Sequence, residues 1–387
     1  MSAGKYAALI LAAGFSTRMG QGFKPLLPLP FADGERNALE SLVRLYAEAG
    51  IGRILVVVGQ CREAELAGEA ARLGLDHVQN PHAERGMFSS VCAGLEALGA
   101  SGAGCFVHPA DIPLVRLLTL RGLLAEAEKY PDEVLVPCFQ GEEGHPPLLP
   151  AVHLPAVRAW TGENGLRGAL RRLSCRPVPL ADKNILLDMD TDDDYAEARG
   201  RAGRRHFLEP DEAEEWLRLL AVGERGRAHG RAVGLVAKVF AVACNAAGAA
   251  LDPRMAEAGG LLHDMCKGEA RHERAAGEKL RALGLPAAAR LVEEHRDLAL
   301  ADQAPITEKE LIYLADKYVC GDRPVTLQER FGRKLEQFSE DAAACAAIRG
   351  RLARAEAMEA RLRRETGVVP FALACDALQK GQRRRSP

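Results

Sequence analysis

The chain has 387 residues, 48% hydrophobic residues, 27% charged residues and a formal net charge of −2. Since one domain usually takes about 100–200 residues, this length predicts two or three domains, and the composition excludes a mostly disordered chain. The apolar run near the N-terminus is too short to span a bilayer and lacks the context of a signal-peptide cleavage site. The ten cysteines form no CxxC pair. We therefore expect a cytoplasmic protein with reduced thiols.

The small net charge is the sum of two unlike halves. Residues 1–198 contain 18 basic and 25 acidic residues, whereas residues 199–387 contain 33 and 28. Eight of the basic residues of the second half lie in two short runs, at 199–205 and 380–385. We interpret these runs as a solvated linker and a frayed tail. Because no basic face remains elsewhere, we exclude nucleic acid and membranes as main partners.

In chain order, the first half alternates short β-rich runs with amphipathic stretches. We expect strands at 7–13, 53–59, 104–110, 134–139, 176–180 and 185–190, with helices such as 37–50 and 88–99 between them. This alternation predicts a three-layer α/β domain over residues 1–198, in which helices cover both faces of a mainly parallel sheet.

The second half loses the β-rich runs after the Arg-rich segment. Helical spacing recurs at 211–222, 227–248, 252–266, 272–283, 286–295, 307–319 and 339–365. We therefore expect an Arg-rich linker at 199–210, an all-α domain at 211–335, and C-terminal helices with a basic tail at 336–387.

The segment LILAAGFSTRMGQGFKPLLPL, residues 9–29, carries the first chemical signal. A buried strand runs into Gly14, and a polar turn with Arg18 and Lys24 follows. Such a loop offers free backbone N–H groups and two cations to a chain of phosphates. The alternative is a plain strand, turn and helix with solvated basic side chains.

Five further segments follow in order: NPHAERGMFSS (80–90), HPADIPLV (108–115), GEEGHPPLL (141–149), GENGLRGAL (162–170) and LLDMDTDDDY (186–195). Together with the first segment they resemble the motifs of the molybdopterin-type nucleotidyltransferases. The resemblance covers about residues 5–198 and implies a Rossmann-like fold that transfers NMP from an NTP to molybdopterin cofactor and releases pyrophosphate. Ala13 in LAAG, GMFSS and GHP lean toward the cytidylyl branch, whereas the spacing from Arg18 to Lys24 is that of the guanylyl branch. CTP is therefore favoured over GTP.

The resemblance also implies the roles of individual residues. Asp111 and Asp190, each expected to end a strand, would hold one Mg²⁺ ion. Arg18, Lys24 and Asp111 would be catalytic. Without the resemblance, Asp111 reads equally well as a helix N-cap, Asp190 as an acidic cap of the helix from Asp192, and His145 as a turn residue. The residues implied to bind the nucleotide are Ala12, Ala13, Gly14, Arg18, Lys24, Asn80, Ser89, Ser90, Asp111 and His145.

The second half holds the ordered set His229, His263–Asp264, His272, His295 and Asp316. This set resembles the pattern of the HD-domain metal-dependent phosphohydrolases over about residues 211–335. The resemblance implies one divalent transition metal, such as Fe, Mn or Co, on His229, His263, Asp264 and Asp316, and a second on His272 and His295 with Asp264 bridging. Lys267 would steady the substrate phosphate. The alternative for each histidine alone is a partly buried, hydrogen-bonded side chain.

Together, the two halves imply a bifunctional enzyme with a nucleotidyltransferase and a phosphohydrolase domain. Its partners would be an NTP, a molybdopterin-type acceptor and a molybdoenzyme that receives the cofactor. The alternative is a nucleotidyltransferase for a sugar phosphate or another small molecule, with the HD half as a regulatory or binding module.

Overall fold

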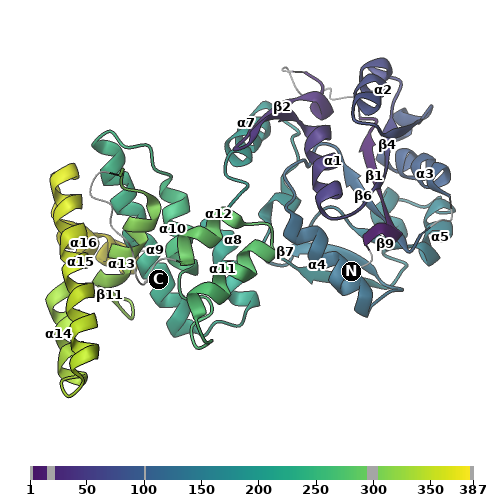
Figure 1. The fold of residues 1–387 in the computed structure, drawn as a ribbon. Helices are drawn as coiled ribbons and strands as arrows, with labels where there is room; N and C mark the ends of the chain where they lie inside the picture. The colour runs from purple at the N-terminus through teal and green to yellow at the C-terminus, as the bar shows by residue number, and fades with distance from the viewer. Residues whose placement is uncertain (1–2, 15–21, 100–101, 294–303, 384–387) are drawn as a thin grey trace. The chain divides into compact units, whose positions relative to one another are not determined.

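The computed structural model describes residues 3–14, 22–99, 102–293 and 304–383. It divides into two compact units, Met1–Arg205 and His206–Pro387 (Figure 1). Among the described residues, no helix is both long enough and apolar enough to cross a membrane.

The first unit is a mixed α/β domain. Its strands are β1 (Tyr6–Ala12), β2 (Pro28–Phe31), β3 (Gly34–Asn37), β4 (Arg53–Val58), β5 (Asp76–Gln79), β6 (Gly104–Pro109), β7 (Val134–Phe139), β8 (Glu142–Glu143), β9 (Leu148–Pro150) and β10 (Cys175–Pro179). Its helices are α1 (Ala38–Glu48), α2 (Glu63–Arg72), α3 (Met87–Leu98), α4 (Leu117–Lys129), α5 (Leu154–Arg158), α6 (Gly165–Leu170) and α7 (Asp192–Ala202), with 3₁₀ turns η1 (Ala3–Lys5), η2 (Lys24–Leu26), η3 (Ala83–Arg85), η4 (Ala151–His153) and η5 (Lys183–Leu186).

The main sheet has the order β10-β7-β9-β6-β1-β4-β5. β1 pairs in parallel with both β4 and β6, and β7 with β10, whereas β9 runs antiparallel to β6 and β7. The sheet is therefore mixed, and the expectation of a mainly parallel sheet missed the antiparallel strand in its middle. Because β1 lies between β4 and β6, its carboxyl end is a point where the chain crosses to both sides, which is where ligands bind in open α/β sheets.

Three layers form because the buried strands present apolar side chains on both faces. Leu9 of β1 and Val107 of β6 pack with the helices α3, α5 and α6 in one core. On the other face, Tyr46 of α1 packs against Phe106, and its hydroxyl bonds His108 Nδ1 at 2.9 Å. Figure 1 shows α1 and α3 on opposite sides of β1 and β6. The three-layer α/β prediction is confirmed.

The strand expected at 185–190 does not form. Asp182 is fully buried and accepts hydrogen bonds from the backbone N–H of Asn184 and of Arg116, and so it caps the 3₁₀ turn η5. The chain then continues without regular structure to α7. Ile185 and Met189 of this run are buried without pairing in the sheet.

The Arg-rich segment is not a solvated linker. Arg199 and Arg201 lie in α7, and the Arg205 side chain donates to the Val115 carbonyl while its own carbonyl accepts from Arg116. Burial, reinforced by the charge of Arg116, lowers the pKa of Arg205 to about 10. This segment therefore packs against the first unit.

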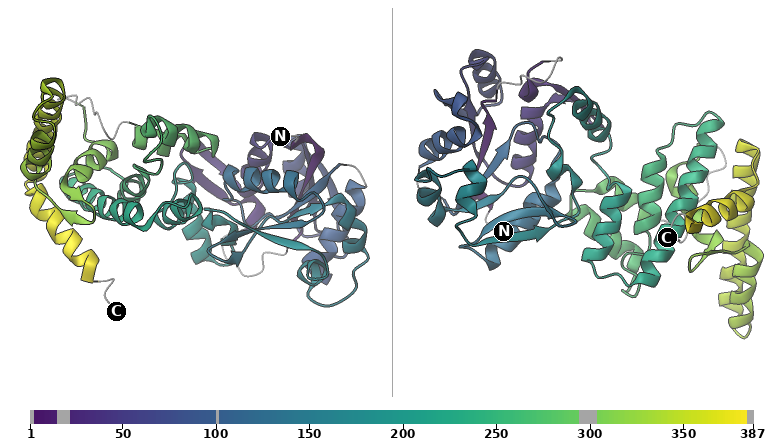
Figure 2. Two further views of the ribbon diagram at one scale, coloured as in Figure 1. Left: turned by 90° about the horizontal axis from the view of Figure 1, so that it is seen from below. Right: turned by 180° about the vertical axis from the view of Figure 1, so that it is seen from behind.

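The second unit is helical, as expected. Its elements are α8 (Pro210–Leu219), α9 (Glu224–Ala246), α10 (Pro253–Leu262), α11 (His272–Ala282), α12 (Pro286–Glu293), α13 (Glu308–Tyr318), a hairpin of β11 (Val319–Cys320) and β12 (Arg323–Pro324), α14 (Leu327–Gln337), α15 (Ala342–Thr366) and α16 (Pro370–Arg383). Figure 2 shows this unit from two further sides, with α15 as its long yellow-green helix. Its core is built on α9 and α13.

Helices α9 and α10 approach each other more closely than side chains would allow. A Cβ atom added to Gly260 of α10 would lie 2.5 Å from the Gly234 Cα of α9, and one added to Gly230 would lie 2.6 Å from the Leu261 carbonyl oxygen. Such contacts are possible only for glycine. The contact brings the first histidine of the metal pattern, on α9, next to the second, which directly follows α10.

Candidate active sites

The first candidate site is a cavity of about 330 Å³ at the carboxyl ends of β1 and β6. The residues that line it include Ala12, Ala13, Gly14, Lys24, Ser90, Asp111 and Asp190. The loop after β1 thus faces the polar residues that follow β6, as the topology of the sheet requires.

Lys24 joins the two carboxylates of this cavity. Its ammonium nitrogen lies 2.5 Å from Asp190 Oδ1 and 3.1 Å from Asp111 Oδ2. Burial favours the neutral amine, but the hydrogen bond to Asp190 and the charge of Asp111 outweigh it, and the pKa of Lys24 is raised. The two carboxylates are therefore already held around one cation, which is the donor set that Mg²⁺ prefers.

A backbone contact explains why Asp190 reaches Asp111 without a strand. The Met189 N–H donates to the Asp111 carbonyl at 2.9 Å. Neither carboxylate is a helix cap, because α4 begins only at Leu117 and the N-cap of α7 is Thr191. Both carboxylates instead line the cavity, where Lys24 bridges them.

Among the described residues that the resemblance places at the nucleotide, Asn80, Ser89 and His145 do not line this cavity. Asn80 is buried and donates to Ser89 Oγ at 2.8 Å and Ser90 Oγ at 2.9 Å, so it fixes the first turn of α3. Burial lowers the pKa of the His145 imidazole, and the nearby charge of Asp111 opposes this shift only in part. Arg18 lies outside the described residues.

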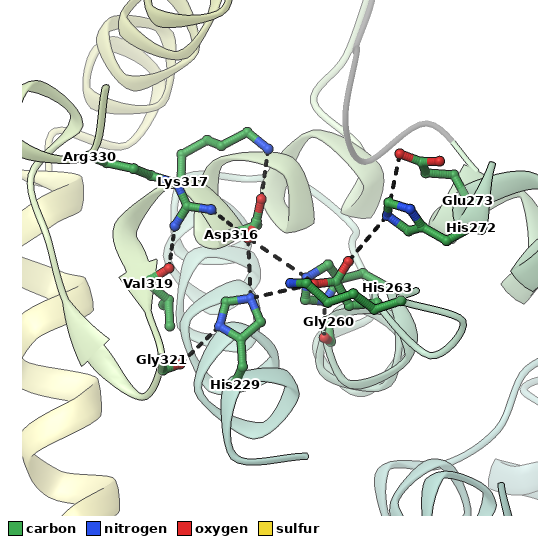
Figure 3. Close-up of polar contacts among 12 residues, drawn as sticks. His229, Gly260, His263, His272, Glu273, Asp316, Lys317, Val319, Gly321 and Arg330 are labelled. Atoms are coloured by element: carbon green, nitrogen blue, oxygen red, sulfur yellow. Dashed lines mark hydrogen bonds and ion pairs between the residues drawn. The ribbon is translucent and has the colours of Figure 1, made fainter. Parts of the chain in front are cut away.

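The second candidate site lies between α9, α10 and α13. His229 Nε2 is 3.4 Å from Asp316 Oδ1 and 4.0 Å from Asp264 Oδ2, and His263 Nε2 is 3.7 Å and 3.6 Å from the same oxygens (Figure 3). His229, His263 and Asp264 offer ligand atoms that all lie within 4.8 Å of one another.

Backbone carbonyls orient both imidazoles. His229 Nδ1 bonds the Gly321 carbonyl at 2.9 Å, in the β11–β12 hairpin, and His263 Nδ1 bonds the Gly260 carbonyl at 2.7 Å. Because a carbonyl only accepts, Nδ1 carries the proton and Nε2 presents its lone pair to the site. Histidine ligands of metals are usually fixed in this way, so these residues fit a divalent metal.

His272 and Lys267 contact Asp264 from other directions. His272 Nε2, at the start of α11, lies 3.5 Å from Asp264 Oδ1 and 3.4 Å from Glu273 Oε1. The Lys267 ammonium lies 2.5 Å from Asp264 Oδ2. His263 and Asp264 lie in the turn after α10, not on the helix as expected. His295, predicted as a further ligand, lies outside the described residues.

The sequence interpretation missed several residues at both sites. Asp188 lies close to the first site, where burial, with the charge of Asp190, raises the pKa of its carboxyl group. Glu273 pairs with His272, and Lys317 and Arg330 bond Asp316 at 2.7 Å and 3.2 Å. For Asp188 the signal was available, since it belongs to the quoted LLDMD segment. The sequence around Arg330 gives no such signal, because a basic residue on an amphipathic helix is usually expected to lie in solvent.

Two family models match successive parts of the chain. Residues 8–178 match the MobA-like NTP transferase domain, and residues 220–319 match the HD domain. Molybdenum cofactor cytidylyltransferase of Escherichia coli K12 is 26% identical over 193 residues, which are 50% of this chain and 95% of that protein.

Solved structures similar to part of this chain include Rv0371c from Mycobacterium tuberculosis H37Rv. Its sequence identity is 23%, the match covers 51% of this chain and 100% of that chain, and the TM-score is 0.43. Molybdopterin-guanine dinucleotide biosynthesis protein A from Archaeoglobus fulgidus shows 20% identity, coverage of 50% and 97%, and a TM-score of 0.37. The sequence matches identify a chain with a MobA-like NTP transferase domain followed by an HD domain.

Proposed function

We propose that the first domain transfers NMP, with CMP favoured over GMP, from an NTP to the terminal phosphate of molybdopterin cofactor. The cavity at the ends of β1 and β6, with Lys24 between Asp111 and Asp190, is the observation that carries this proposal. The 26% identity to a molybdenum cofactor cytidylyltransferase supports a nucleotidyltransferase of this kind, and the GMFSS and GHP segments favour CMP.

The residues of the cavity divide the work of such a transfer. Backbone N–H groups around Ala13 and Gly14 face the phosphates, and Lys24 neutralises their charge. Asp111 and Asp190 would hold Mg²⁺, which when bound offsets the charge that develops on the phosphates. An oxygen of the acceptor phosphate then bonds the α-phosphorus as the bond to the β-phosphate oxygen breaks, and pyrophosphate leaves.

The transfer is tested by measuring pyrophosphate release from the full chain with Mg²⁺, each of four NTPs, and either molybdopterin cofactor or glucose 1-phosphate. We expect turnover with CTP and molybdopterin cofactor and a loss of about 100-fold or more in Asp111→Asn. Asp76→Asn, at the exposed start of β5, is the matched control and should keep full turnover. Turnover with the sugar phosphate alone, or an Asp111→Asn enzyme as active as the parent, contradicts the proposal.

We further propose that the HD domain hydrolyses phosphate esters with a divalent metal such as Fe, Mn or Co. The inward-facing Nε2 atoms of His229 and His263, with Asp264 and Asp316 beside them, carry this proposal. A metal held by these four residues would acidify water and polarise a phosphoryl oxygen. Lys267, which pairs with Asp264, would steady the substrate phosphate. His272 contacts Asp264 on its other oxygen and, with His295, would hold a second metal.

Elemental analysis of the purified chain tests this second activity, followed by hydrolysis of p-nitrophenyl phosphate after loading with each metal. We expect bound metal to be lost in His229→Ala and in Asp264→Asn. It should be retained in His77→Ala, which removes an exposed histidine of the first unit. A chain that binds none of the three metals refutes the proposal.

A further inference from the structure

Two cations of the second unit bond Asp316 of the HD site, and two more lie near enough for the charges of Arg330, Lys317 and Arg351 to act on Lys334. These four are Lys317 of α13, Arg330 and Lys334 of α14, and Arg351 of α15, and we call them the α13–α15 cationic cluster. Three of its members lie beyond residue 319, where the match to the HD domain ends. The C-terminal helices therefore add charge to the site that the matched region does not supply.

Two members touch the site directly. The Lys317 ammonium is 2.7 Å from Asp316 Oδ2, and Arg330 Nη2 is 3.2 Å from Asp316 Oδ1. The other arm of the Arg330 guanidinium donates to the Val319 carbonyl, which holds the fork in place. Figure 3 shows both cations on one side of Asp316, with His272 and Glu273 on the other side of the site.

The other two members continue the cluster outward. Lys334 follows Arg330 by one helical turn, and its ammonium lies 5.9 Å from the centre of the Phe331 ring. Tyr313 ties α15 to α13, because its hydroxyl donates to the Arg351 carbonyl at 3.4 Å and the Lys317 ammonium lies 4.8 Å from its ring centre.

The electrostatic field of the cluster is positive. Burial and then the charges of Arg330 and Lys317 lower the pKa of Lys334, and the opposing charge of Asp316 does not restore it. A divalent metal on Asp316 would add two more positive charges. An anion with several charges is therefore the ligand that this side of the site stabilises most.

We propose that the α13–α15 cationic cluster binds the second phosphate of a polyphosphorylated substrate while its first phosphate lies at the metal centre. This inference rests on the proposed hydrolase function and names its substrate class: nucleoside di- and triphosphates in preference to monophosphate esters. Arg330 positions Asp316 and faces the phosphate chain, and Lys334 and Arg351 contact the phosphate farther from the metal. The fork of a guanidinium and the compact charge of an ammonium both suit phosphate oxygens.

The test compares kcat/KM of the metal-loaded full chain for AMP, ADP and ATP in Lys334→Ala and Arg351→Ala. We expect ADP and ATP to be preferred by the parent chain. In each variant kcat/KM for ADP and ATP should fall about tenfold, mainly through KM, and that for AMP by less than about twofold. Arg333→Ala removes the same charge from the adjacent position of α14, where its charge acts on Glu329, and should change nothing.

A second measurement does not depend on turnover. Binding of inorganic pyrophosphate to the chelator-treated chain, followed by calorimetry, should weaken about tenfold in Lys334→Ala and stay unchanged in Arg333→Ala. Equal losses for AMP and ADP, or a parent chain that prefers AMP, overturn the inference. If neither a nucleotide nor p-nitrophenyl phosphate is hydrolysed, the proposed hydrolase function fails, and the pyrophosphate titration alone decides whether the cluster binds phosphates.

Discussion

The ammonium group of Lys24 lies 2.5 Å from Asp190 Oδ1, so a cation of the chain itself stands at a carboxylate that Mg²⁺ would use. The same ammonium is 3.1 Å from Asp111 Oδ2. A free metal ion must displace the ammonium group from the two carboxylates without giving it a new partner. A metal that arrives with an NTP also brings phosphates, and the ammonium group can pair with these instead. The pair thus favours entry of the metal together with its nucleotide.

Lys24→Met should therefore separate metal binding from nucleotide binding. We expect the affinity for Mn²⁺ without nucleotide, measured by electron paramagnetic resonance, to rise at least about tenfold, because each 1.4 kcal/mol of lost competition is a factor of ten. Nucleotide transfer should be lost. Lys129→Met, which removes an exposed lysine of the first unit, should change neither. Unchanged Mn²⁺ affinity in Lys24→Met would show that the lysine does not compete with the metal.

The hairpin that orients His229 offers a second test. Gly321 has φ +65° and supplies the carbonyl that fixes the imidazole, and Gly367 has φ +72° at the end of α15. A valine in this left-handed region costs about 1–2 kcal/mol at either position. Gly321→Val should weaken metal binding about 10–100-fold, as losses of outer contacts to metal ligands do. Gly367→Val should lose similar stability and keep its metal affinity in the same titration.

The contact between α9 and α10 leads to a third expectation. Gly260→Ala should destabilise the second unit by roughly 1–3 kcal/mol, because the new Cβ meets the backbone of Gly234. Gly332→Ala, in α14, meets nothing within 4 Å and should instead stabilise by about 0.4–1 kcal/mol. Urea unfolding read from Trp216 in a Trp160→Phe background distinguishes the two. A stabilised Gly260→Ala would show that the helices can separate freely.

His108 gives the first unit a pH dependence. The imidazole is fully buried between the Tyr46 hydroxyl and the Ile112 carbonyl, and burial lowers its pKa from 6.5 to about 3. Between pH 6.5 and pH 3 the imidazole is protonated in the unfolded chain but neutral in the native state. The contribution of His108 to the free energy of unfolding is therefore fully present above pH 6.5 and is lost as the pH falls toward 3. The slope for this group approaches about 1.4 kcal/mol per pH unit.

Urea unfolding of unit 1 checks this expectation, with Trp160 fluorescence followed in a Trp216→Phe background from pH 7 to pH 5. His108→Gln should flatten the profile even if it lowers stability overall. His77→Gln, which removes an exposed histidine of β5, should leave the slope unchanged. A His108→Gln profile parallel to that of the parent would contradict the assignment.

The sequence predicted the parts of the fold that depend on local pattern. Strand β1 and the helices α9, α10 and α13 lie within a few residues of their expected bounds, because apolar spacing and flanking glycine or proline determine them. Residues 185–190 have the composition of a strand, but they do not pair with a neighbouring strand. Their first part instead belongs to the 3₁₀ turn η5, which Asp182 caps. Its approach to Asp111 depends on one tertiary hydrogen bond that no local pattern encodes.

The same distinction holds at the sites. His229 and Asp264 were identifiable because their residue types and order carry the chemistry. The contact of Arg330 with Asp316 was not, because it depends on how α14 packs against α13. An ion pair between two helices depends on their tertiary packing, and the spacing of residues in the sequence does not predict it.

The glycines of α9 and α10 have a consequence for how this chain can diverge. Where two helices touch main chain to main chain, the spacing of the residues they carry is set by van der Waals radii and not by the choice of side chains. The apolar residues around His229 and His263 can then be exchanged for others of similar volume without moving the two imidazoles apart. A saturation scan should show a tolerant core surrounding three intolerant positions, 230, 234 and 260.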